Sequence, residues 1–396
     1  MTTSSSKFCR TATLSLLTVA AIGPVLYPLW LGWRTRGLPD PEPPEPTSWP
    51  DLAVVVPAFR EQSVIAAKVE NLLANGYPGQ LEVIIVADDK ETAASARATS
   101  ARVIAPPKRL GKAAALNLGV RSANSKIVAI TDANAMIDAG SLEKLVRWFD
   151  DPSIGAVAAE KHIETTSGES AYWMFESWLK RRESRTGTTI GLIGELAAFR
   201  REEYVELPED IAVDDLWLAL DVVERGARIA YEPEVCASEA ESATIADEWE
   251  RRTRIVAGAN DVLWRRRRLL IPGSSPVAVQ LWGHRLFRQS LGPLAHVGLV
   301  LIALASVRKS RLARGFLALH AFGASSFVRQ RRGLSSGRFG RLAAQVLFLQ
   351  AVGIGGTIRW ARGDRPARWP KPERVLPTCG DSGNSSSPPS PRSMAL

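Results

Sequence analysis

The stretch LAVVVP at residues 52–57 is an uninterrupted apolar run, and it opens the part of the chain that decides the fold. Two further runs, EVIIVADD at 82–89 and KIVAITDAN at 126–134, have the same character and end in acidic or amide side chains. Such runs are typical of parallel strands that are buried on both faces. Apolar residues with helical spacing at 63–74 and a helical stretch at 112–122 alternate with them. The pattern predicts a doubly wound α/β sheet.

The residues that end these strands are candidate site residues, because ligands of doubly wound sheets bind outside the carboxyl ends of the strands. Asp88 and Asp89 end the second run, and Asp132 and Asn134 end the third. A single acidic strand end is commonly a helix cap, but several that meet at one edge indicate a binding site. Oxygen ligands spaced like Asp132 and Asn134 suit Mg²⁺ or Mn²⁺ that bridges a diphosphate.

A basic loop and helix, RLGKAAALNLG at 109–119, lies between these strands. Arg109 and Lys112 could neutralise phosphate oxygens near the N-terminus of the helix. The segment is not a Walker loop, because the pattern GxxxxGK[ST] is absent, and it contains no GxGxxG.

In combination, these motifs resemble the catalytic domain of the membrane-anchored family 2 glycosyltransferases, which has the GT-A fold. Six segments agree with the motifs of that family in order and spacing. They are VVVPAFREQSVI at 54–65, IIVADDKETA at 84–93, RLGKAAALNLG at 109–119, ITDAN at 130–134, GLIGELAAFRRE at 191–202 and VDDLWLALDVVERGARIAYEPE at 213–234. The resemblance implies a GT-A domain, a Rossmann-like doubly wound mixed sheet, flanked by transmembrane helices.

The resemblance also implies roles for individual residues. Asp215 would be the catalytic base at the acceptor hydroxyl, and Asp132 and Asn134 would hold Mg²⁺ or Mn²⁺ at the donor diphosphate. Ala58, Glu61 and Asp89 would contact the base and ribose of the nucleotide. The full set expected to bind substrate is Pro57, Ala58, Glu61, Asp88, Asp89, Lys112, Asp132, Asp214, Arg251 and Arg254.

The chemistry of sugar transfer requires the same kinds of groups, a carboxylate and a cation. An inverting sugar transfer needs a carboxylate that takes the acceptor proton and a cation that stabilises the leaving diphosphate. Asp214 and Asp215 precede an amphipathic stretch at 216–224, so they would lie near a helix start. Simple interaction with the helix dipole is the alternative role for this pair.

Two departures from the family pattern concern the substrate site. Lys90 and Glu91 stand where the family usually has Gly and Ser. The Q-x-x-R-W motif of processive synthases appears as Arg251 to Ile255, in which Arg254 is kept and Ile255 replaces Trp. Because Ile cannot stack on a sugar through an aromatic face, the sequence leaves open whether one sugar or many are added.

Apolar runs lie at both ends of the chain. Residues 11–33 carry no charge and are numerous enough for a helix across the ~30 Å core of a bilayer, with a secretory signal peptide as the alternative. Further runs lie at 289–307, 315–328 and 342–358. The expected divisions are a transmembrane helix (1–36), a Pro-rich linker (37–50), the GT-A domain (51–271), an amphipathic interfacial segment (272–290), transmembrane helices (291–360) and a basic, then disordered Ser/Pro-rich tail (361–396).

Composition excludes several other classes of protein. Of the 396 residues, 45% are apolar and 23% are charged, which is typical of a folded chain. Cys9, Cys236 and Cys379 are too scattered for a disulfide framework or a zinc site, which indicates a reducing compartment. The net charge of +9 comes from basic residues that cluster beside apolar runs, so a nucleic-acid partner is not expected.

The sequence therefore predicts an integral protein of the cell membrane with its catalytic domain in the cytoplasm. Its predicted activity is that of an inverting glycosyltransferase. The enzyme would move a sugar from a nucleotide-diphospho-sugar, expected to be UDP-linked, to a saccharide or lipid-linked acceptor at the bilayer. The alternative is a catalytically silent membrane scaffold protein that binds a nucleotide sugar, because the Gln and Trp of the processive motif are missing.

Overall fold

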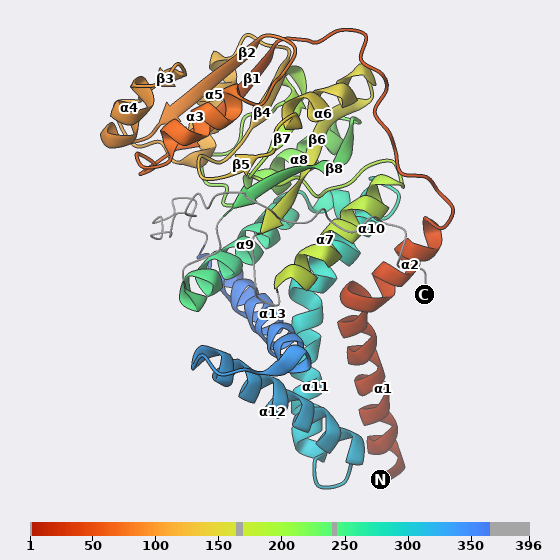
Figure 1. Cartoon of the computed structure of the whole chain (residues 1–396). Helices are drawn as coiled ribbons and strands as arrows, with labels where there is room; N and C mark the ends of the chain where they lie inside the picture. The colour runs from red at the N-terminus through yellow and green to blue at the C-terminus, as the bar shows by residue number, and fades with distance from the viewer. Residues whose placement is uncertain (1, 164–168, 240–243, 365–396) are drawn as a thin grey trace.

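The computed structural model describes residues 2–163, 169–239 and 244–364 (Figure 1). An α/β domain forms one end of the molecule, and long helices from both ends of the chain form a bundle at the other. The predicted Ser/Pro-rich tail lies, from residue 365 on, outside the described residues.

The α/β domain is built on one mixed sheet with the strand order β3-β2-β1-β4-β7-β6-β8-β5. Its first half is parallel and consists of β1 (Leu52–Ala58), β2 (Leu81–Ala87), β3 (Arg102–Ile104) and β4 (Ile127–Ile130). The predicted apolar runs form β1, β2 and β4, and these strands are largely buried. Their carboxyl ends meet at one edge, where the candidate site residues follow them.

The second half of the sheet contains antiparallel pairs. β7 (Ala197–Arg200) runs antiparallel to both β4 and β6 (Ile154–Ile163). β6 pairs in parallel with β8 (Arg228–Glu239), and the short β5 (Met136–Ile137) lies at the edge against β8. The β4–β7 pair therefore places the start of β7 beside the carboxyl end of β4.

Helices cover both faces of the sheet. They are α3 (Ile65–Leu73), α4 (Lys90–Arg97), α5 (Lys112–Ser122), α6 (Ser141–Arg147), α7 (Glu169–Ser184) and α8 (Asp214–Glu224). Val55 of β1 packs with residues of α5 and α8, whereas its neighbour Val54 packs with residues of α3 and α6. The backbone of α5 lies directly on β1, since a Cβ at Gly119 would be only 2.3 Å from Cγ1 of Val55.

The helix α4 begins where the sequence departs from the family pattern. Asp89 caps its first turn, because the Asp89 carboxylate accepts a hydrogen bond from the N–H of Thr92 at 2.8 Å. Lys90 and Glu91 form that turn, and an acidic residue there is favourable beside the helix dipole. The replacement of Gly and Ser by Lys90 and Glu91 is thus accommodated as the start of a helix.

Within the described residues, three helices are long and apolar enough to cross a membrane. They span Arg10–Arg34, Ala278–Ser306 and Gly337–Ala361. The first combines the end of α1 (Thr2–Ala21) with η1 (Ile22–Leu26) and α2 (Tyr27–Arg34). The second combines α10 (Ala278–Gln280), η5 (Leu281–Leu291) and α11 (Gly292–Ser306), and the third is α13 (Gly337–Ala361).

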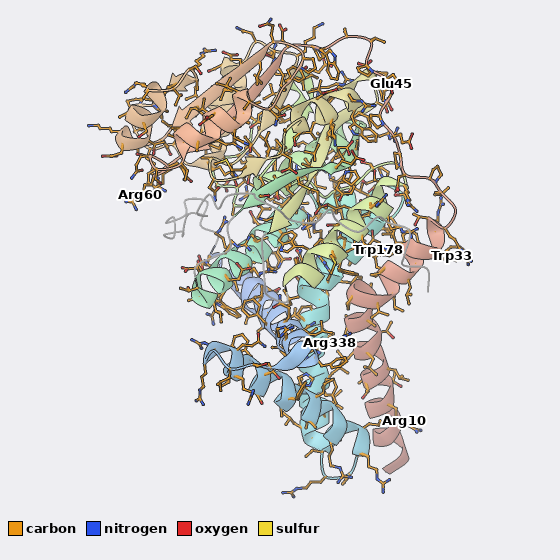
Figure 2. All side chains as sticks on the ribbon, in the orientation of Figure 1. Arg10, Trp33, Glu45, Arg60, Trp178 and Arg338 are labelled. Atoms are coloured by element: carbon orange, nitrogen blue, oxygen red, sulfur yellow. The ribbon has the colours of Figure 1, made fainter. Side chains whose placement is uncertain are left out.

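The first candidate span runs toward the α/β domain. Arg10 lies at the end of the bundle that is far from the domain, and Trp33 lies near it (Figure 2). Trp178 of α7 packs on α2, since a Cβ at Gly32 would lie 3.6 Å from its ring. The run predicted at 315–328 lies in α12 (Arg311–Arg331), which is not among the three candidate spans.

The last helix returns to the α/β domain. α13 packs along α9 (Ile245–Arg265), where a Cβ at Gly356 would lie 2.5 Å from Cβ of Val256. Near the end of α13, Arg359 pairs with Glu250 at 2.8 Å. These close contacts join the helix bundle to the domain that carries the candidate site.

Candidate active site

The carboxylates of Asp88 and Asp89, which follow β2, hold the loops that follow β3 and β1. Asp88 accepts hydrogen bonds from the N–H groups of Leu110 at 2.6 Å and Gly111 at 2.8 Å. Asp89, in addition to capping α4, accepts a hydrogen bond from the N–H of Arg60 at 2.6 Å. Although burial acts to raise the pKa of Asp89, its backbone hydrogen bonds lower it. Both carboxylates therefore shape this edge of the sheet.

The other residues predicted at this edge follow β1. Pro57 and Ala58 are the last residues of the strand, and the C=O of Ala58 accepts a hydrogen bond from the N–H of Asp88 at 2.8 Å. The N–H of Glu61 donates to Oγ1 of Thr92 at 2.9 Å. The structure thus brings Pro57, Ala58 and Glu61 to the same loops as Asp88.

Lys112 joins the ends of three elements. Its ammonium nitrogen lies 2.9 Å from Oδ1 of Asp132, which follows β4, and 3.1 Å from Oδ2 of Asp214, which begins α8. Burial acts to lower the pKa of Lys112, but the two carboxylates outweigh burial and hold that pKa above its ordinary value. A charged Lys112 therefore holds Asp132 and Asp214 at one point.

Two glycines make this arrangement possible. Gly111, the N-cap of α5, has a φ of 89°, a left-handed conformation that favours glycine. Because the start of β7 lies beside the end of β4, Gly194 approaches Lys112, and a Cβ there would be 3.1 Å from Nζ. The sequence motif at 191–202 predicts an acceptor segment but gives no signal for this contact.

A buried lysine braces the turn that carries Asp132 and Asn134. Lys68 of α3 is fully buried, and its ammonium donates to Oγ1 of Thr131 at 2.9 Å and to the C=O of Ala135. Burial lowers the pKa of Lys68 to about 7, while the charge of Asp132 acts to raise it. Sequence reasoning does not identify Lys68, although a lysine within the apolar face of a helix is a visible signal.

The donor set of Asp132 and Asn134 fits a divalent cation that is shared with a ligand. Carboxylate and amide oxygens are hard ligands, and Mg²⁺ is usually held by one or two carboxylates together with substrate phosphates. Within the described ranges, no group of three or more His, Cys, Asp or Glu side chains is placed to hold a metal. A cation at Asp132 would therefore depend on oxygens of a bound diphosphate.

Asp215 lies beside this cluster in the first turn of α8. Its Oδ1 accepts a hydrogen bond from the N–H of Leu216 at 2.7 Å. Burial, and then the charge of Asp214, raise the pKa of Asp215 from 3.8 to about 6. Such a carboxylate is ionised at neutral pH and is a better proton acceptor than an ordinary Asp.

Asp215 lines a cavity of about 330 Å³ that extends from the α/β domain toward the membrane helices. Its wall combines residues of α7, α9, η5, α11 and α13. Glu195 and Asp215 belong to the domain, whereas Val346 and Val352 belong to the third candidate span. The cavity thus connects the candidate base with the apolar helix bundle.

The two arginines predicted to bind substrate have different surroundings. Arg251 lines the cavity, and both carboxylate oxygens of Glu248 accept hydrogen bonds from it at 3.0 and 2.9 Å. Arg254 donates to the C=O of Ala212 at 3.0 Å, and burial lowers its pKa to about 10. Ile255, which stands in place of the family Trp, also lines the cavity.

Two aromatic residues of α7 that sequence reasoning does not identify also line the cavity, Tyr172 and Trp173. The ammonium of Lys161 lies 5.1 Å from the centre of the Trp173 ring and pairs with Glu195. Aromatic rings stack on apolar faces of ligands. α7 therefore supplies the aromatic surface that Ile255 cannot.

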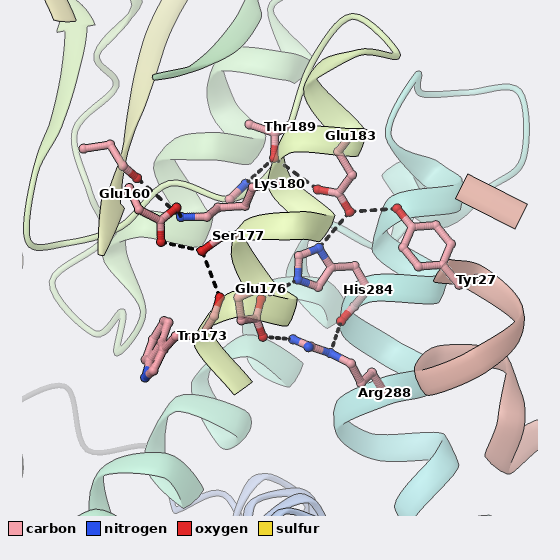
Figure 3. A network of polar contacts seen from close by, with 12 residues as sticks. Tyr27, Glu160, Trp173, Glu176, Ser177, Lys180, Glu183, Thr189, His284 and Arg288 are labelled. Atoms are coloured by element: carbon pink, nitrogen blue, oxygen red, sulfur yellow. Dashed lines mark hydrogen bonds and ion pairs between the residues drawn. The ribbon is translucent and has the colours of Figure 1, made fainter. Parts of the chain in front are cut away.

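A buried polar network closes the cavity next to the second membrane span (Figure 3). His284 of η5 contacts Glu183 through Nδ1 at 2.7 Å and Glu176 through Nε2 at 2.9 Å. The hydroxyl of Tyr27 donates to Glu183 at 2.7 Å, and Arg288 pairs with Glu176. The imidazole ring of His284 therefore bridges the carboxylates of Glu183 and Glu176. The segment predicted as interfacial therefore turns its basic residues toward α7.

Residues 53–207 match the family described as Glycosyl transferase family 2. The chain carries a family 2 glycosyltransferase domain. The match confirms the family that the sequence motifs resemble. The matched part of the glycosyltransferase domain includes Lys112 and Asp132, whereas Asp214 and Asp215 follow it.

Curated relatives of this glycosyltransferase domain are named for transfer of N-acetylglucosamine. Poly-beta-1,6-N-acetyl-D-glucosamine synthase of Staphylococcus aureus (strain COL) is 24% identical over 230 residues, which cover 54% of this chain and 56% of the relative. An N-acetylglucosaminyltransferase of Rhizobium sp. (strain N33) is 24% identical over 220 residues, which cover 48% of each protein. The chain thus spans about half the length of these relatives.

A solved structure resembles most of the chain. It is a mannosyltransferase of Pyrobaculum calidifontis in complex with GDP-mannose and Mn²⁺, with a TM-score of 0.73 and 25% identity. The similarity covers 89% of this chain and 99% of the mannosyltransferase. The predicted GT-A fold of the glycosyltransferase domain is confirmed.

Proposed function

We propose that the protein is an inverting glycosyltransferase of the membrane. It moves a sugar from a nucleotide-diphospho-sugar, with a UDP-linked donor expected, to a hydroxyl group of a saccharide or lipid-linked acceptor. The observation that carries the proposal is the position of Asp215, which lies next to the cluster held by Lys112 and lines a cavity large enough for an acceptor group. The names of the relatives support sugar transfer as the reaction.

The donor would lie along the carboxyl edge of β1, β2 and β4. The loops shaped by Asp88 and Asp89, together with Pro57, Ala58 and Glu61, would hold the nucleoside. Lys112 would bring a positive charge to the diphosphate, next to the N-terminus of α5.

Asp132 and Asn134 would hold Mg²⁺ or Mn²⁺, which when bound would stabilise the negative charge of the leaving diphosphate. The mannosyltransferase that this chain resembles was solved with Mn²⁺ and a nucleotide sugar, which supports the assignment. Lys68 would keep Thr131 and Ala135 in place on either side of these two residues.

Asp215 would accept the proton of the acceptor hydroxyl. The hydroxyl oxygen forms a bond to the anomeric carbon of the donor sugar while the bond from that carbon to the diphosphate breaks. Because the incoming oxygen and the leaving diphosphate are on opposite sides, the configuration inverts. A carboxylate with a pKa of about 6 is mostly ionised at neutral pH and is ready to act as the base.

The catalytic domain would face the cytoplasm, because it uses a nucleotide-sugar donor, and the N-terminus of α1 would then lie outside. An exposed position in the domain, Arg201, allows this to be tested. An Arg201→Cys variant in which the native Cys9, Cys236 and Cys379 are replaced by Ser should resist a membrane-impermeant maleimide in intact cells and should react with it in inverted vesicles. Labelling of intact cells would contradict the proposed orientation.

The activity is tested with purified full-length protein, Mn²⁺ and radiolabelled UDP-N-acetylglucosamine, UDP-glucose and GDP-mannose. Membrane lipid extracts and oligosaccharides serve as acceptors, and the labelled product is identified by mass spectrometry. Transfer from one donor that is lost in Asp215→Asn is the expected result. Nucleotide binding without transfer or hydrolysis would instead select a silent scaffold, which the Ile at position 255 also favours.

A further inference from the structure

We infer that the cavity next to Asp215 binds an amphiphilic acceptor in which an anionic phosphate joins a sugar to a hydrocarbon chain. The sugar hydroxyl would lie at Asp215, the phosphate at Arg285, and the chain between the membrane helices. This inference rests on the proposed function and specifies the substrate class of the same site.

The lining of the cavity combines charged residues of the catalytic domain with apolar residues of the candidate membrane spans. Asp215, Glu195 and Lys161 line the part in the catalytic domain. The candidate membrane spans contribute the apolar residues Ala20, Pro24, Pro293, Leu349, Val352 and Gly353, together with polar residues that include Arg285 and Arg288. A ligand that fills the cavity would therefore have one polar end and one apolar end of the kind that a bilayer accommodates.

Most of the basic side chains around the cavity already face a carboxylate. Lys161 pairs with Glu195. Arg251 and Arg252 both pair with Glu248. The charges of these basic side chains are therefore neutralised within the protein, and an added anion would gain little by binding to them.

Arg285 and Arg288 each have a buried donor group that no such ion pair satisfies. Nε of Arg285 and Nη1 of Arg288 are buried, and neither has a hydrogen-bond partner among the residues that the structure describes. Arg288 uses another of its nitrogens to pair with Glu176, whereas Arg285 lies near enough to Asp215 to act on its charge. Both arginines line the cavity.

Buried donors without partners are unfavourable, and a ligand that accepts their hydrogen bonds removes that cost. The planar guanidinium group matches phosphate oxygens particularly well. A neutral linkage would leave the buried Nε of Arg285 and Nη1 of Arg288 without an acceptor. The arrangement therefore favours a phosphate over an uncharged linkage.

The aromatic residues of the wall fit the sugar part of this acceptor. Trp173 lines the cavity, and its Nε1 is buried without a hydrogen-bond partner among the described residues. A sugar offers both an apolar face for the ring and hydroxyl oxygens for the indole N–H. In this acceptor, Asp215 would take the proton of a sugar hydroxyl, because the phosphate is already ionised.

The site is tested by photolabelling the full-length protein in lipid nanodiscs, a measurement that needs no turnover. The probes are dodecyl phosphate and dodecanol, each with a diazirine at the end of the chain. Dodecyl phosphate should label cavity residues of α11 or α13, and Arg285→Met should weaken this labelling by at least about tenfold. Arg285→Lys should retain much of it, and labelling by dodecanol should not depend on Arg285.

Arg268→Met is the control, because Arg268 is exposed and does not line the cavity. Equal labelling of the wild-type protein by both probes, or undiminished labelling of a folded Arg285→Met protein, would overturn the inference. If Arg285→Met does not fold, the comparison of the two probes on the wild-type protein decides. Displacement of the probe by phosphatidylglycerol as efficiently as by dodecyl phosphate would show an ordinary bilayer lipid and also overturn it.

A transfer assay separates this inference from the proposed function. The acceptors are N-acetylglucosamine joined to dodecanol either through a phosphate or directly, so that only the phosphate differs. A lower KM for the phosphate-linked acceptor, lost in Arg285→Met, is expected. Phosphate-selective labelling without transfer from any donor would contradict the proposed function but not the lipid-phosphate site. Transfer with equal KM values for the two acceptors would support the proposed function and contradict the lipid-phosphate site.

Discussion

The ammonium nitrogen of Lys68 lies 2.9 Å from the hydroxyl oxygen of Thr131, the residue that precedes Asp132. The same ammonium donates to the C=O of Ala135, so one buried side chain holds both ends of the turn that contains Asp132 and Asn134. Groups that orient metal ligands in this way typically change metal affinity by about 10–100-fold when they are removed.

Lys68→Met should therefore raise the Mn²⁺ concentration needed for half-maximal transfer by about tenfold or more, with a smaller loss at saturating Mn²⁺. The Met side chain fills similar space without a buried charge, so the domain should remain folded. Titration of transfer with Mn²⁺ and direct Mn²⁺ binding measured by electron paramagnetic resonance check this. Lys126→Met, at an exposed lysine, is the control and should leave both measurements unchanged.

Asp132→Asn should abolish transfer that depends on a divalent cation, because Asp132 supplies the one charged oxygen of the proposed metal site. Circular dichroism should show an intact fold. Asp138→Asn alters an exposed carboxylate only a few residues away and should have no effect. Near-normal activity of Asp132→Asn at all Mn²⁺ concentrations would remove Asp132 from the metal site.

Asp215→Asn should reduce transfer by about 10²–10⁴-fold, the usual contribution of a general base. Binding of the nucleotide should persist, since deprotonation matters only as the acceptor attacks. Isothermal titration with UDP and a transfer assay on the same preparation separate the two effects.

Asp214→Asn is the matched comparison for this variant. Asp214 pairs with Lys112 at 3.1 Å, so its loss should disturb the donor side and weaken nucleotide binding. If Asp214→Asn removed transfer without changing UDP affinity, and Asp215→Asn did not, the roles of the two residues would be exchanged.

The pH dependence of transfer should reflect the raised pKa of Asp215. Below pH of about 6, kcat/KM should fall as the base becomes protonated. Because the charge of Asp214 is one cause of the raised pKa, Asp214→Asn should move this inflection to lower pH in whatever activity remains. An inflection that stays in place would show that the charge of Asp214 does not contribute to the raised pKa of Asp215.

Stability should respond to the same group. Folding raises the pKa of Asp215 from 3.8 to about 6, so ionisation of Asp215 destabilises the folded state. That destabilisation grows as the pH rises from about 4 to about 6 and is fully present at pH 7. Asp215→Asn should thus raise the thermal midpoint of the purified protein at pH 7, and the gain should shrink toward pH 4.

The contact between α13 and α9 can be tested at Gly356. A Cβ at this position would lie 2.5 Å from Cβ of Val256 and 2.8 Å from the C=O of Thr253, so Gly356→Ala must push the helices apart. The thermal midpoint should fall. Gly315→Ala in α12 is the control, because a Cβ at Gly315 has no neighbour within 4 Å among the described residues. It should be neutral or slightly stabilising, as Ala favours a helix by about 1 kcal/mol over Gly.

The parallel strands and their ends could be predicted because the information is local. Each run of apolar residues around β1, β2 and β4 is long enough to identify a buried strand by itself. The rule that ligands bind at the carboxyl ends then brings Asp88, Asp132 and Asn134 to one edge. α4 is harder to recognise, because only Thr92, Ala93 and Ala96 of this polar helix are buried.

The cavity could not be predicted from local patterns. Its wall is assembled from Trp173, Arg251, Arg285 and Val352, which come from four helices far apart in the chain. Each helix shows only a mixture of apolar and basic residues, which fits an interfacial helix as well as a cavity wall. The inward direction of Arg285 depends on how η5 packs on α7, and that packing is a property of the whole fold.

The bonds of Glu183 also set an order for the synthesis of the protein. The carboxylate of Glu183 contacts Tyr27, which is synthesised long before Glu183. It also contacts His284, which follows Glu183 by 101 residues. Until the second candidate span is made, the buried carboxylates of Glu176 and Glu183 lack their partners His284 and Arg288. We therefore expect α7 to reach its final packing only after the second candidate span has been synthesised. A nascent chain stalled before residue 284 should leave α7 open to protease, and one stalled beyond residue 306 should protect it.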